Sequence, residues 1–170
     1  IDAGAREKPH AHKARMAAEA KIIFDMPLPS ACAHGTFTAP AAYELASIDG
    51  LRREVFGPVL HVVRFAGNRM AEVCDSLNAT GFGLTLGLHT RIESTVRQVR
   101  QRVRVGNMYV NRNQIGAVVG AQPFGGEGLS GTGPKAGGSQ YMHRFATERV
   151  CSTDTTASGG NAALMSMETK

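Results

Sequence analysis

The sequence predicts an α/β fold with a parallel sheet, because strand-like and helix-like segments alternate between residues 59 and 110. Apolar runs typical of strands stand at residues 59–65, 83–88 and 108–110. Strands that alternate with helices of this length indicate right-handed crossovers and a parallel sheet. A chain of 170 residues with 42% hydrophobic and 19% charged residues fits one globular domain with a core of its own.

Two helices are predicted between these strands. The first spans residues 70–77, with Asn68 as its N-cap. The second begins at a Ser/Thr-x-x-Glu capping box formed by Thr90 and Glu93, and Gly106 is expected to end it as a C-cap. One face of the second helix carries four apolar residues at helical spacing: Ile92, Val96, Val99 and Val103. The arginines on its other faces are best explained as a solvated surface.

The N-terminal part is predicted to contain one helix and two strands. Residues 2–20 are rich in helix formers, and Pro9 is expected to open or interrupt that helix. A short strand is predicted at residues 22–25. Residues 37–43 are apolar but contain Pro40, so an edge strand is expected there.

Residues 111–138 form a loop that carries nearly half of the chain's 20 glycines. Gly and Pro disfavour helices and strand interiors, whereas interspersed apolar residues distinguish this segment from a flexible linker. An ordered loop of this kind is typically functional. Residues 126–131 match the dinucleotide fingerprint G-x-G-x-x-G, but the required strand before and helix after are absent from the sequence pattern. Turns with positive φ therefore explain these glycines better than a nucleotide site.

The composition argues against several other classes of protein. The net charge of +5 is spread along the chain, which does not favour nucleic-acid binding. No stretch approaches the roughly 18 apolar residues of a transmembrane helix. Cys32, Cys74 and Cys151 match no metal spacing, and an odd number without a secretory signal predicts a cytoplasmic protein. The N-terminus has no initiator Met and reads like the middle of a longer chain.

Two signatures, one in each half of the chain, resemble the aldehyde dehydrogenase superfamily. The first is Glu54-Val55-Phe56-Gly57-Pro58, and the second runs from Asn111-Arg112-Asn113 to Gln122-Pro123-Phe124-Gly125-Gly126. The whole loop resembles the L-glutamate γ-semialdehyde (pyrroline-5-carboxylate) dehydrogenases, in the version found in bacterial proline utilization A. The resemblance implies a partial parallel-sheet, three-layer catalytic domain of the aldehyde dehydrogenase type over residues 1–150. Residues 151–170 would be an extended tail that serves as an oligomerisation arm.

The same resemblance implies roles for five residues. Glu54 would contact the hydroxyls of the nicotinamide ribose of NAD, and Phe56 would pack beside the nicotinamide. The backbone N–H groups of Gly116 and Ala117 would bind the substrate's α-carboxylate, and Phe124 would line the aldehyde site. From the residue pattern alone, Glu54 could equally be a surface acid before a turn, Phe56 a core ring, and Phe124 a ring that anchors the loop.

The catalytic thiolate of this family stands farther upstream of the E-x-F-G-P glutamate than the 53 residues available here. Cys32 also lacks the family's flanking glycines, so no catalytic residue is assigned and the chain alone is expected to be inactive. The implied partners are glutamate γ-semialdehyde, the rest of the parent dehydrogenase and further copies in a homo-oligomer. FAD is expected only where the parent also carries a fused proline dehydrogenase.

Two alternatives remain open from the sequence. One is another aldehyde dehydrogenase with a different substrate, against which Gly116-Ala117 and the following residues 118–120 argue. The other is a non-catalytic module that assembles through an exposed sheet edge and the polar tail.

Overall fold

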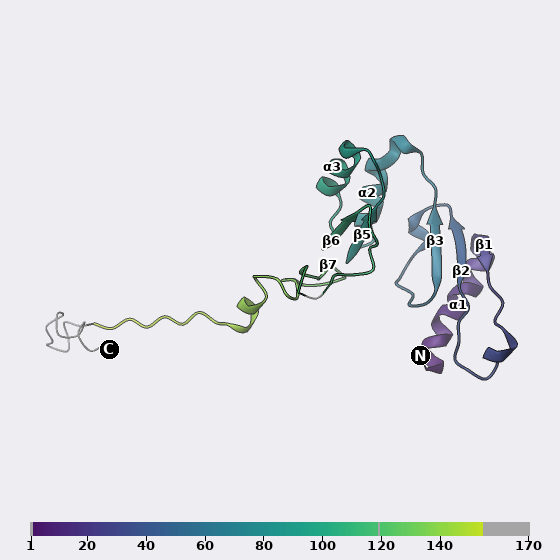
Figure 1. Ribbon diagram of the computed structural model, residues 1–170, viewed down its shortest axis with the longest axis horizontal. Coiled ribbons are helices and arrows are strands. Elements are labelled where there is room, and N and C mark those ends of the chain that lie inside the picture. Colours follow the sequence, from purple (N-terminus) through teal and green to yellow (C-terminus); the bar gives the residue numbers. More distant parts are fainter. Residues whose placement is uncertain (1, 119, 155–170) are drawn as a thin grey trace.

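The computed structural model describes residues 2–118 and 120–154, and Figure 1 shows two groups of elements followed by a C-terminal stretch. The first group contains one helix and three strands: α1 (Ala3–Glu19), β1 (Lys21–Asp25), β2 (Ala41–Leu45) and β3 (Val59–Val63). The second group contains two helices and two strands: α2 (Met70–Ala79), β5 (Thr85–Leu88), α3 (Glu93–Arg102) and β6 (Asn107–Val110). Two short strands, β4 (Phe82–Gly83) and β7 (Glu127–Gly128), join the glycine-rich loop to the second group.

The strands form separate sheets in the described residues. The first sheet has the order β1-β2-β3, with β1 antiparallel to β2 and β2 parallel to β3. β5 and β6 pair in parallel, and β4 pairs with β7 in antiparallel fashion. The α/β class and the strands at 59–65, 83–88 and 108–110 are therefore confirmed. β3 does not pair with β5, however: it is an edge strand of the first sheet, and β5 pairs with β6 in a separate sheet. Chain order predicts strand neighbours only as a tendency.

The expectation of an edge strand at residues 37–43 is wrong. β2 begins after Pro40 and is the central strand, with its alternate residues buried. Their side chains meet α1 in a small core made of Met16, Ala41, Tyr43 and Leu45, each at most 8% exposed. Pro40 is tolerated because it precedes the strand, and its carbonyl accepts a hydrogen bond from Met26 N at 3.1 Å.

Pro9 lies inside α1, so the expectation that it opens or interrupts the helix is also wrong. The helix begins earlier, at an N-cap where the Asp2 carboxylate accepts a hydrogen bond from Ala5 N at 2.7 Å. The Pro9 ring is buried against Gly57, where an added Cβ would lie 2.8 Å from the Pro9 Cβ. Burial of the ring offsets the hydrogen bond that proline cannot donate.

The helix boundaries differ from those predicted at three caps. Asn68 lies in a single 3₁₀ turn, and the cap of α2 is Arg69 without a side-chain bond. No capping box forms at α3: its N-cap is Ile92, and Thr90, two residues before that cap, accepts a hydrogen bond on Oγ1 from Ile92 N at 3.1 Å. α3 ends before Val103, because Gly106 already belongs to a close approach between two loops.

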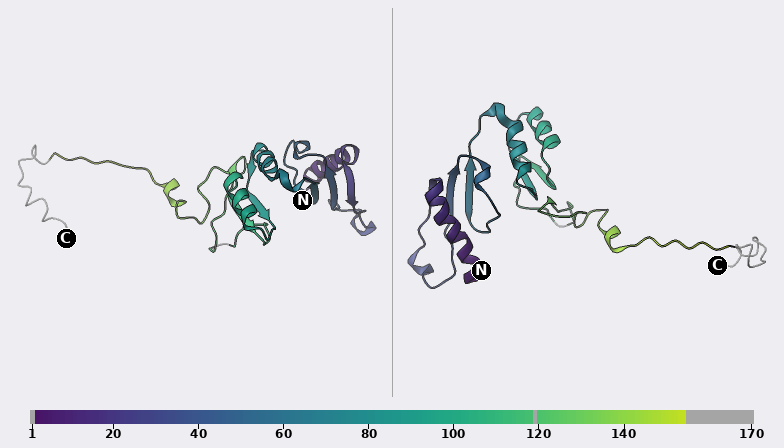
Figure 2. Two further views of the ribbon diagram at one scale, coloured as in Figure 1. Left: turned by 90° about the horizontal axis from the view of Figure 1, so that it is seen from above. Right: turned by 180° about the vertical axis from the view of Figure 1, so that it is seen from behind.

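The C-terminal stretch leads away from the folded part of the chain in all three ribbon views (Figures 1 and 2). After a 3₁₀ turn at Met142–Phe145, residues 146–154 are exposed and contain neither helix nor strand. Most of the predicted oligomerisation arm, residues 155–170, lies outside the described residues, so that arm stays a prediction. No helix in the described part of the chain is both long and apolar enough to cross a bilayer.

Candidate cofactor and substrate site

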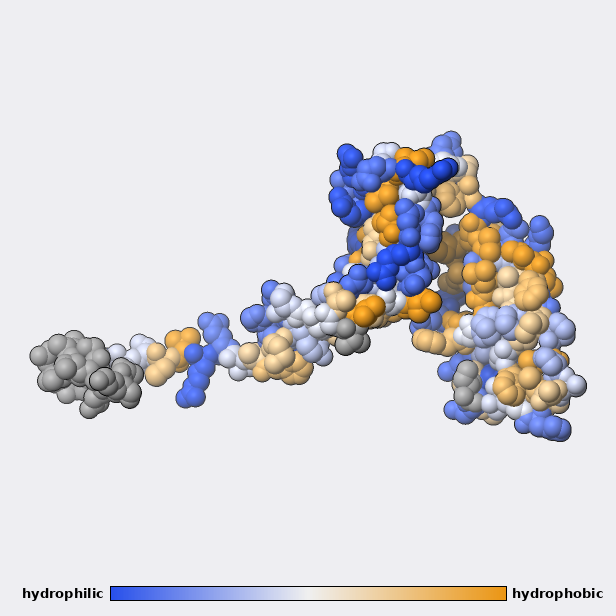
Figure 3. Space-filling model, viewed as in Figure 1, coloured by the Kyte–Doolittle hydropathy of each residue, from blue (hydrophilic) through white to orange (hydrophobic). Residues whose placement is uncertain are grey.

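Glu54 and Phe56 lie together on the wall of a cleft of about 650 Å³. They come from the connection between β2 and β3 in the first group of elements, directly before β3. The opposite wall comes from the second group and includes Leu77, Phe82, Leu84, Leu86, Val103 and Leu129. Figure 3 shows this hollow between the two halves of the folded part. The cleft thus presents one carboxylate and two arginines, Arg53 and Arg104, beside an apolar surface.

The segment that carries Glu54 and Phe56 packs against α1. Gly57 packs against Pro9 at a distance that leaves no room for a side chain. Phe56 is 81% exposed, so its ring is not part of a core formed by the described residues. Glu54 makes no hydrogen bond or ion pair among the described residues, so its oxygens are free to accept donors from a ligand.

Gly116 and Ala117 lie in the loop that follows β6. Both are half-buried, and neither N–H donates a hydrogen bond within the described part of the chain. A Cβ built on Gly116 would meet no atom within 4 Å, so the space beside it is open. Consecutive free N–H groups can bind the oxygens of an anion. The arrangement is therefore able to hold a carboxylate.

Phe124 is held by its backbone. Its N–H donates to the Ala136 carbonyl, and its carbonyl accepts from Ala136 N–H, each at 3.0 Å. Its side chain is half-buried. The backbone bridge agrees with a loop-anchoring residue, and the predicted contact with the aldehyde stays a prediction.

Among the glycines of the G-x-G-x-x-G stretch, Gly128 has the positive φ predicted from the sequence, whereas Gly126 and Gly131 do not. Gly128 has φ 60° and pairs with Phe82 as part of β7. Leu129 N donates to Gly81 O at 2.9 Å, and Ser130 Oγ accepts from Gly83 N at 3.0 Å. These contacts bind the stretch to β4 and to Gly81, the residue before it, which makes the glycines part of the scaffold of the cleft.

Two arrangements were not predicted from the sequence. The Asn111 amide makes two hydrogen bonds to the backbone of Thr90, and the N-x-N motif was the only signal that could have pointed to it. His12 of α1 and His61 of β3 place their Nε2 atoms 2.8 Å apart, with the rings at 77°. No sequence pattern indicates that pair, because 49 residues separate its members.

Burial lowers the pKa of both histidines. For His12, the nearby His61, Arg15 and Arg53 lower the pKa further, whereas Glu19 acts in the opposite direction. For His61, Arg15 adds to the effect of burial. Positive charge around the pair makes it a poor cation site, and the pair is a direct contact between α1 and β3.

The aldehyde dehydrogenase family profile matches residues 1–150, and the chain belongs to that family. The bifunctional protein PutA of Klebsiella aerogenes is 51% identical over 154 residues, which are 88% of this chain and 12% of that protein. The 1-pyrroline-5-carboxylate dehydrogenase of Bacillus subtilis is 41% identical over 93 residues, covering 54% of this chain and 18% of the relative. The chain therefore spans less than a fifth of the length of these relatives.

Solved structures give the same relationship. A proline utilization A (PutA) variant from Bradyrhizobium japonicum matches with a TM-score of 0.82 and 53% identity, over 88% of this chain and 15% of that one. A 1-pyrroline-5-carboxylate dehydrogenase from Thermus with bound NAD matches with a TM-score of 0.75 and 33% identity, over 85% of this chain and 28% of that one. The predicted family and fold are confirmed, including its narrower resemblance to these dehydrogenases.

Proposed function

We propose that this chain is part of an NAD-dependent dehydrogenase that oxidises L-glutamate γ-semialdehyde to L-glutamate in proline catabolism. The observation that carries the proposal is the pair of unpaired N–H groups on Gly116 and Ala117, in an open loop that follows β6. An amino-acid semialdehyde has an α-carboxylate that such a pair can hold, whereas a simple aldehyde does not. The names of the relatives support the same substrate.

Glu54 and Phe56 fit one edge of a dinucleotide site. The Glu54 carboxylate has no partner among the described residues and can accept two ribose hydroxyls, and the exposed Phe56 ring offers an apolar face to a nicotinamide. When bound, NAD supplies a hydride acceptor for the oxidation. In this proposal the chain's own residues orient that acceptor and exclude water from one side of it.

On the substrate side, Gly116 and Ala117 hold the α-carboxylate while the Phe124 ring packs against the methylene chain. These contacts fix the position of the aldehyde carbon, because the carboxylate lies at the opposite end of the substrate. Fixing both ends converts binding energy into orientation of the reacting group.

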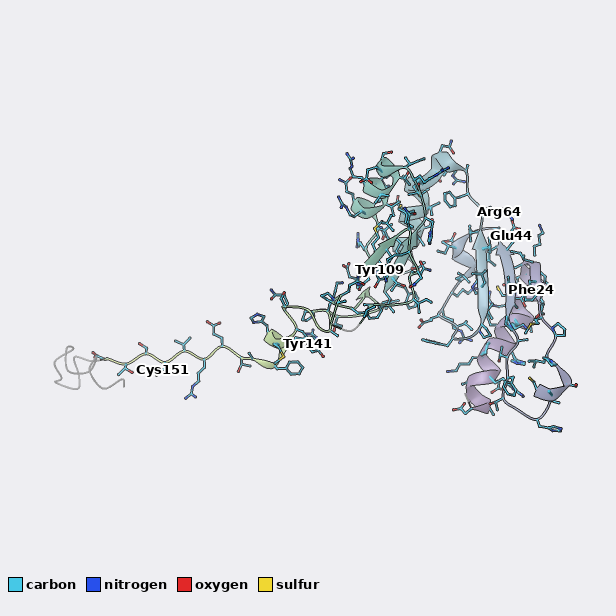
Figure 4. The ribbon with its side chains drawn as sticks, viewed as in Figure 1. Phe24, Glu44, Arg64, Tyr109, Tyr141 and Cys151 are labelled. Carbon is cyan, nitrogen blue, oxygen red and sulfur yellow. The ribbon has the colours of Figure 1, made fainter. Side chains whose placement is uncertain are left out.

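None of the three cysteines lines the cleft, and all three are free thiols. Cys74 is buried in α2, where burial raises the pKa of its thiol and makes it a weak nucleophile. Cys151 lies on the C-terminal stretch, which leads away from the folded part of the chain in Figure 4. We therefore expect the nucleophilic thiolate to come from a part of the parent enzyme outside these 170 residues.

For the parent enzyme we also propose a cellular compartment, an oligomeric assembly and a condition for FAD. The enzyme works in the cytoplasm, where free thiols persist, and it assembles as a homo-oligomer in which residues 151–170 contribute an arm. FAD belongs to the enzyme only where a proline dehydrogenase is fused to it.

NADH formation with glutamate γ-semialdehyde tests the proposal. We expect no turnover by the 170-residue chain and turnover by the longer dehydrogenase that carries it. In that enzyme, Glu54→Gln is expected to raise KM for NAD by roughly tenfold, because a charged hydrogen-bond acceptor is lost. Glu72→Gln, an exposed glutamate of α2, is the matched control.

Ala117→Pro removes one N–H donor and is expected to raise KM for the aldehyde by roughly tenfold, whereas Ala117→Gly keeps the donor and should not. Turnover by the 170-residue chain alone would contradict the proposal, because one of Cys32, Cys74 and Cys151 would then be the nucleophile. Equal activity with aldehydes that lack an α-carboxylate would favour the alternative of a different substrate.

A second candidate is a non-catalytic assembly module. β1 favours it, because it is an edge strand with Ile22, Ile23 and Phe24 each about half exposed. The self-association experiment described in the Discussion tests that alternative.

A further inference from the structure

Asn111 stands where the main chain leaves the sheet. β5 and β6 pair in parallel with Leu88 opposite Val110, and Asn111 N donates to Leu88 O at 2.9 Å. Asn111 itself has φ 55°, and it is the one non-glycine residue with positive φ in the described part of the chain. The main chain therefore turns out of the sheet at this residue.

The side chain of Asn111 continues the sheet after the main chain has left it. In a regular parallel ladder, Thr90 N–H would donate to the Asn111 carbonyl, and the Thr90 carbonyl would accept from Asn113 N–H. Here Thr90 N–H donates to Asn111 Oδ1 at 3.0 Å, and Asn111 Nδ2 donates to the Thr90 carbonyl at 2.9 Å. One side-chain amide thus replaces a backbone carbonyl and a backbone N–H.

Asparagine suits this position for two physical reasons. It tolerates the left-handed conformation better than other non-glycine residues. Its amide also offers an acceptor and a donor on the same short side chain. Aspartate lacks the donor, glycine lacks both groups, and alanine lacks both groups and disfavours the positive φ.

We propose that Asn111 is a positioning residue that fixes the direction of the substrate-anchoring loop, and this inference rests on the function proposed above. Gly116 and Ala117 follow Asn111 by five and six residues. The two bonds to Thr90 hold the start of that short loop against the β5–α3 connection, which is fixed to the sheet. The free N–H groups are thereby presented at one defined place instead of over a range of loop conformations.

The test uses the longer dehydrogenase with the variants Asn111→Gly, Asn111→Asp and Asn111→Ala. Asn111→Gly allows the positive φ but removes the amide, so it separates the effect of the hydrogen bonds from that of the backbone. We expect it to raise KM for the semialdehyde by roughly fivefold to tenfold, with kcat and KM for NAD within about twofold of wild type. Asn111→Asp should lie between wild type and Asn111→Gly, and Asn111→Ala should be the most severe.

Asn113→Gly is the matched control, because Asn113 belongs to the same motif, is exposed and makes no hydrogen bond among the described residues. Wild-type kinetics for Asn111→Gly would overturn the inference. Proportional losses in kcat and in both KM values would overturn it as well, because they would indicate general damage to the fold. Asn111→Gly relieves the backbone strain, so it keeps the test valid if Asn111→Ala fails to fold.

Amide hydrogen exchange separates this inference from the proposed function. Exchange of residues 112–118 should be faster in Asn111→Gly than in wild type, while β6 stays protected, whatever the substrate is. Absence of turnover by wild type with glutamate γ-semialdehyde would contradict the proposed function. Unchanged exchange in this segment would contradict the role of Asn111.

Discussion

The start of β6 depends on Gly106, which has no side chain, and on Lys135, whose ammonium group makes two hydrogen bonds. A Cβ on Gly106 would overlap the Gly125 carbonyl and lie 2.8 Å from Gly126 Cα. Lys135 Nζ donates to the carbonyls of both Gly106 and Gly125, at 2.5 and 3.1 Å. The sequence predicts that Gly106 ends a helix. In the structure its missing side chain instead allows close approach of the backbone at Gly125 and Gly126.

Gly106→Ala should therefore destabilise the protein by about 1–3 kcal/mol, because the new methyl group must displace backbone atoms. The free energy of unfolding in urea provides the measurement. Gly67→Ala serves as control: no atom lies within 4 Å of the added Cβ, and its effect should stay within about 0.5 kcal/mol. Similar values for the two variants would show that the close approach is not a constraint.

Among the secondary-structure elements, α1 and β3 are joined by the His12–His61 hydrogen bond. His12 is 6% exposed and lies on α1, which packs against β1 and β2. One imidazole must be neutral to accept the bond. The bond between the two elements therefore depends on pH.

Stability should fall in acid because of this pair. The folded-state pKa of each histidine is lowered below its ordinary value of 6.5, so the unfolded chain takes up protons first as the pH falls. The pair's contribution is complete above that pH and is lost as the pH decreases through the folded-state pKa. Urea unfolding between neutral and mildly acidic pH measures the slope.

His61→Gln should flatten this pH dependence, and His10→Gln, an exposed histidine of the same helix, should not. A slope that survives in His61→Gln would assign the acid sensitivity to other groups. Stabilisation by added zinc that requires both His12 and His61 would show instead that the pair binds a cation.

For the whole molecule, the important feature is the amount of apolar surface on the outside. The edge strand β1 exposes Ile22, Ile23 and Phe24, and the last of these is labelled in Figure 4. The cleft at Glu54 adds a second apolar surface. Contiguous exposed apolar patches on a protein domain commonly mark contacts with another protein surface.

The isolated chain should therefore self-associate as its concentration increases. Sedimentation velocity at several concentrations measures this, and Phe24→Asp should reduce the association, because it places a charge on the exposed edge. Ile92→Asp introduces the same charge at the exposed N-cap of α3 and should have little effect. A monomer at every concentration would exclude the assembly module.

The sequence by itself determined the family, the α/β class and the position of most helices and strands. These features depend on local patterns: β-branched runs, helical spacing, and the Gly and Pro residues that exclude regular structure. The two signatures around Glu54 and Phe124 are local as well. For this reason the candidate site could be named from the sequence before its cleft was known.

The tertiary structure alone decided which elements meet. The central position of β2, the His12–His61 pair and the bonds between Asn111 and Thr90 join residues that lie far apart in the chain. No local pattern encodes such contacts, because they depend on how the buried faces of several elements pack together. Pro9 is the plainest case: its place within α1 makes sense only beside Gly57, which follows it by 48 residues.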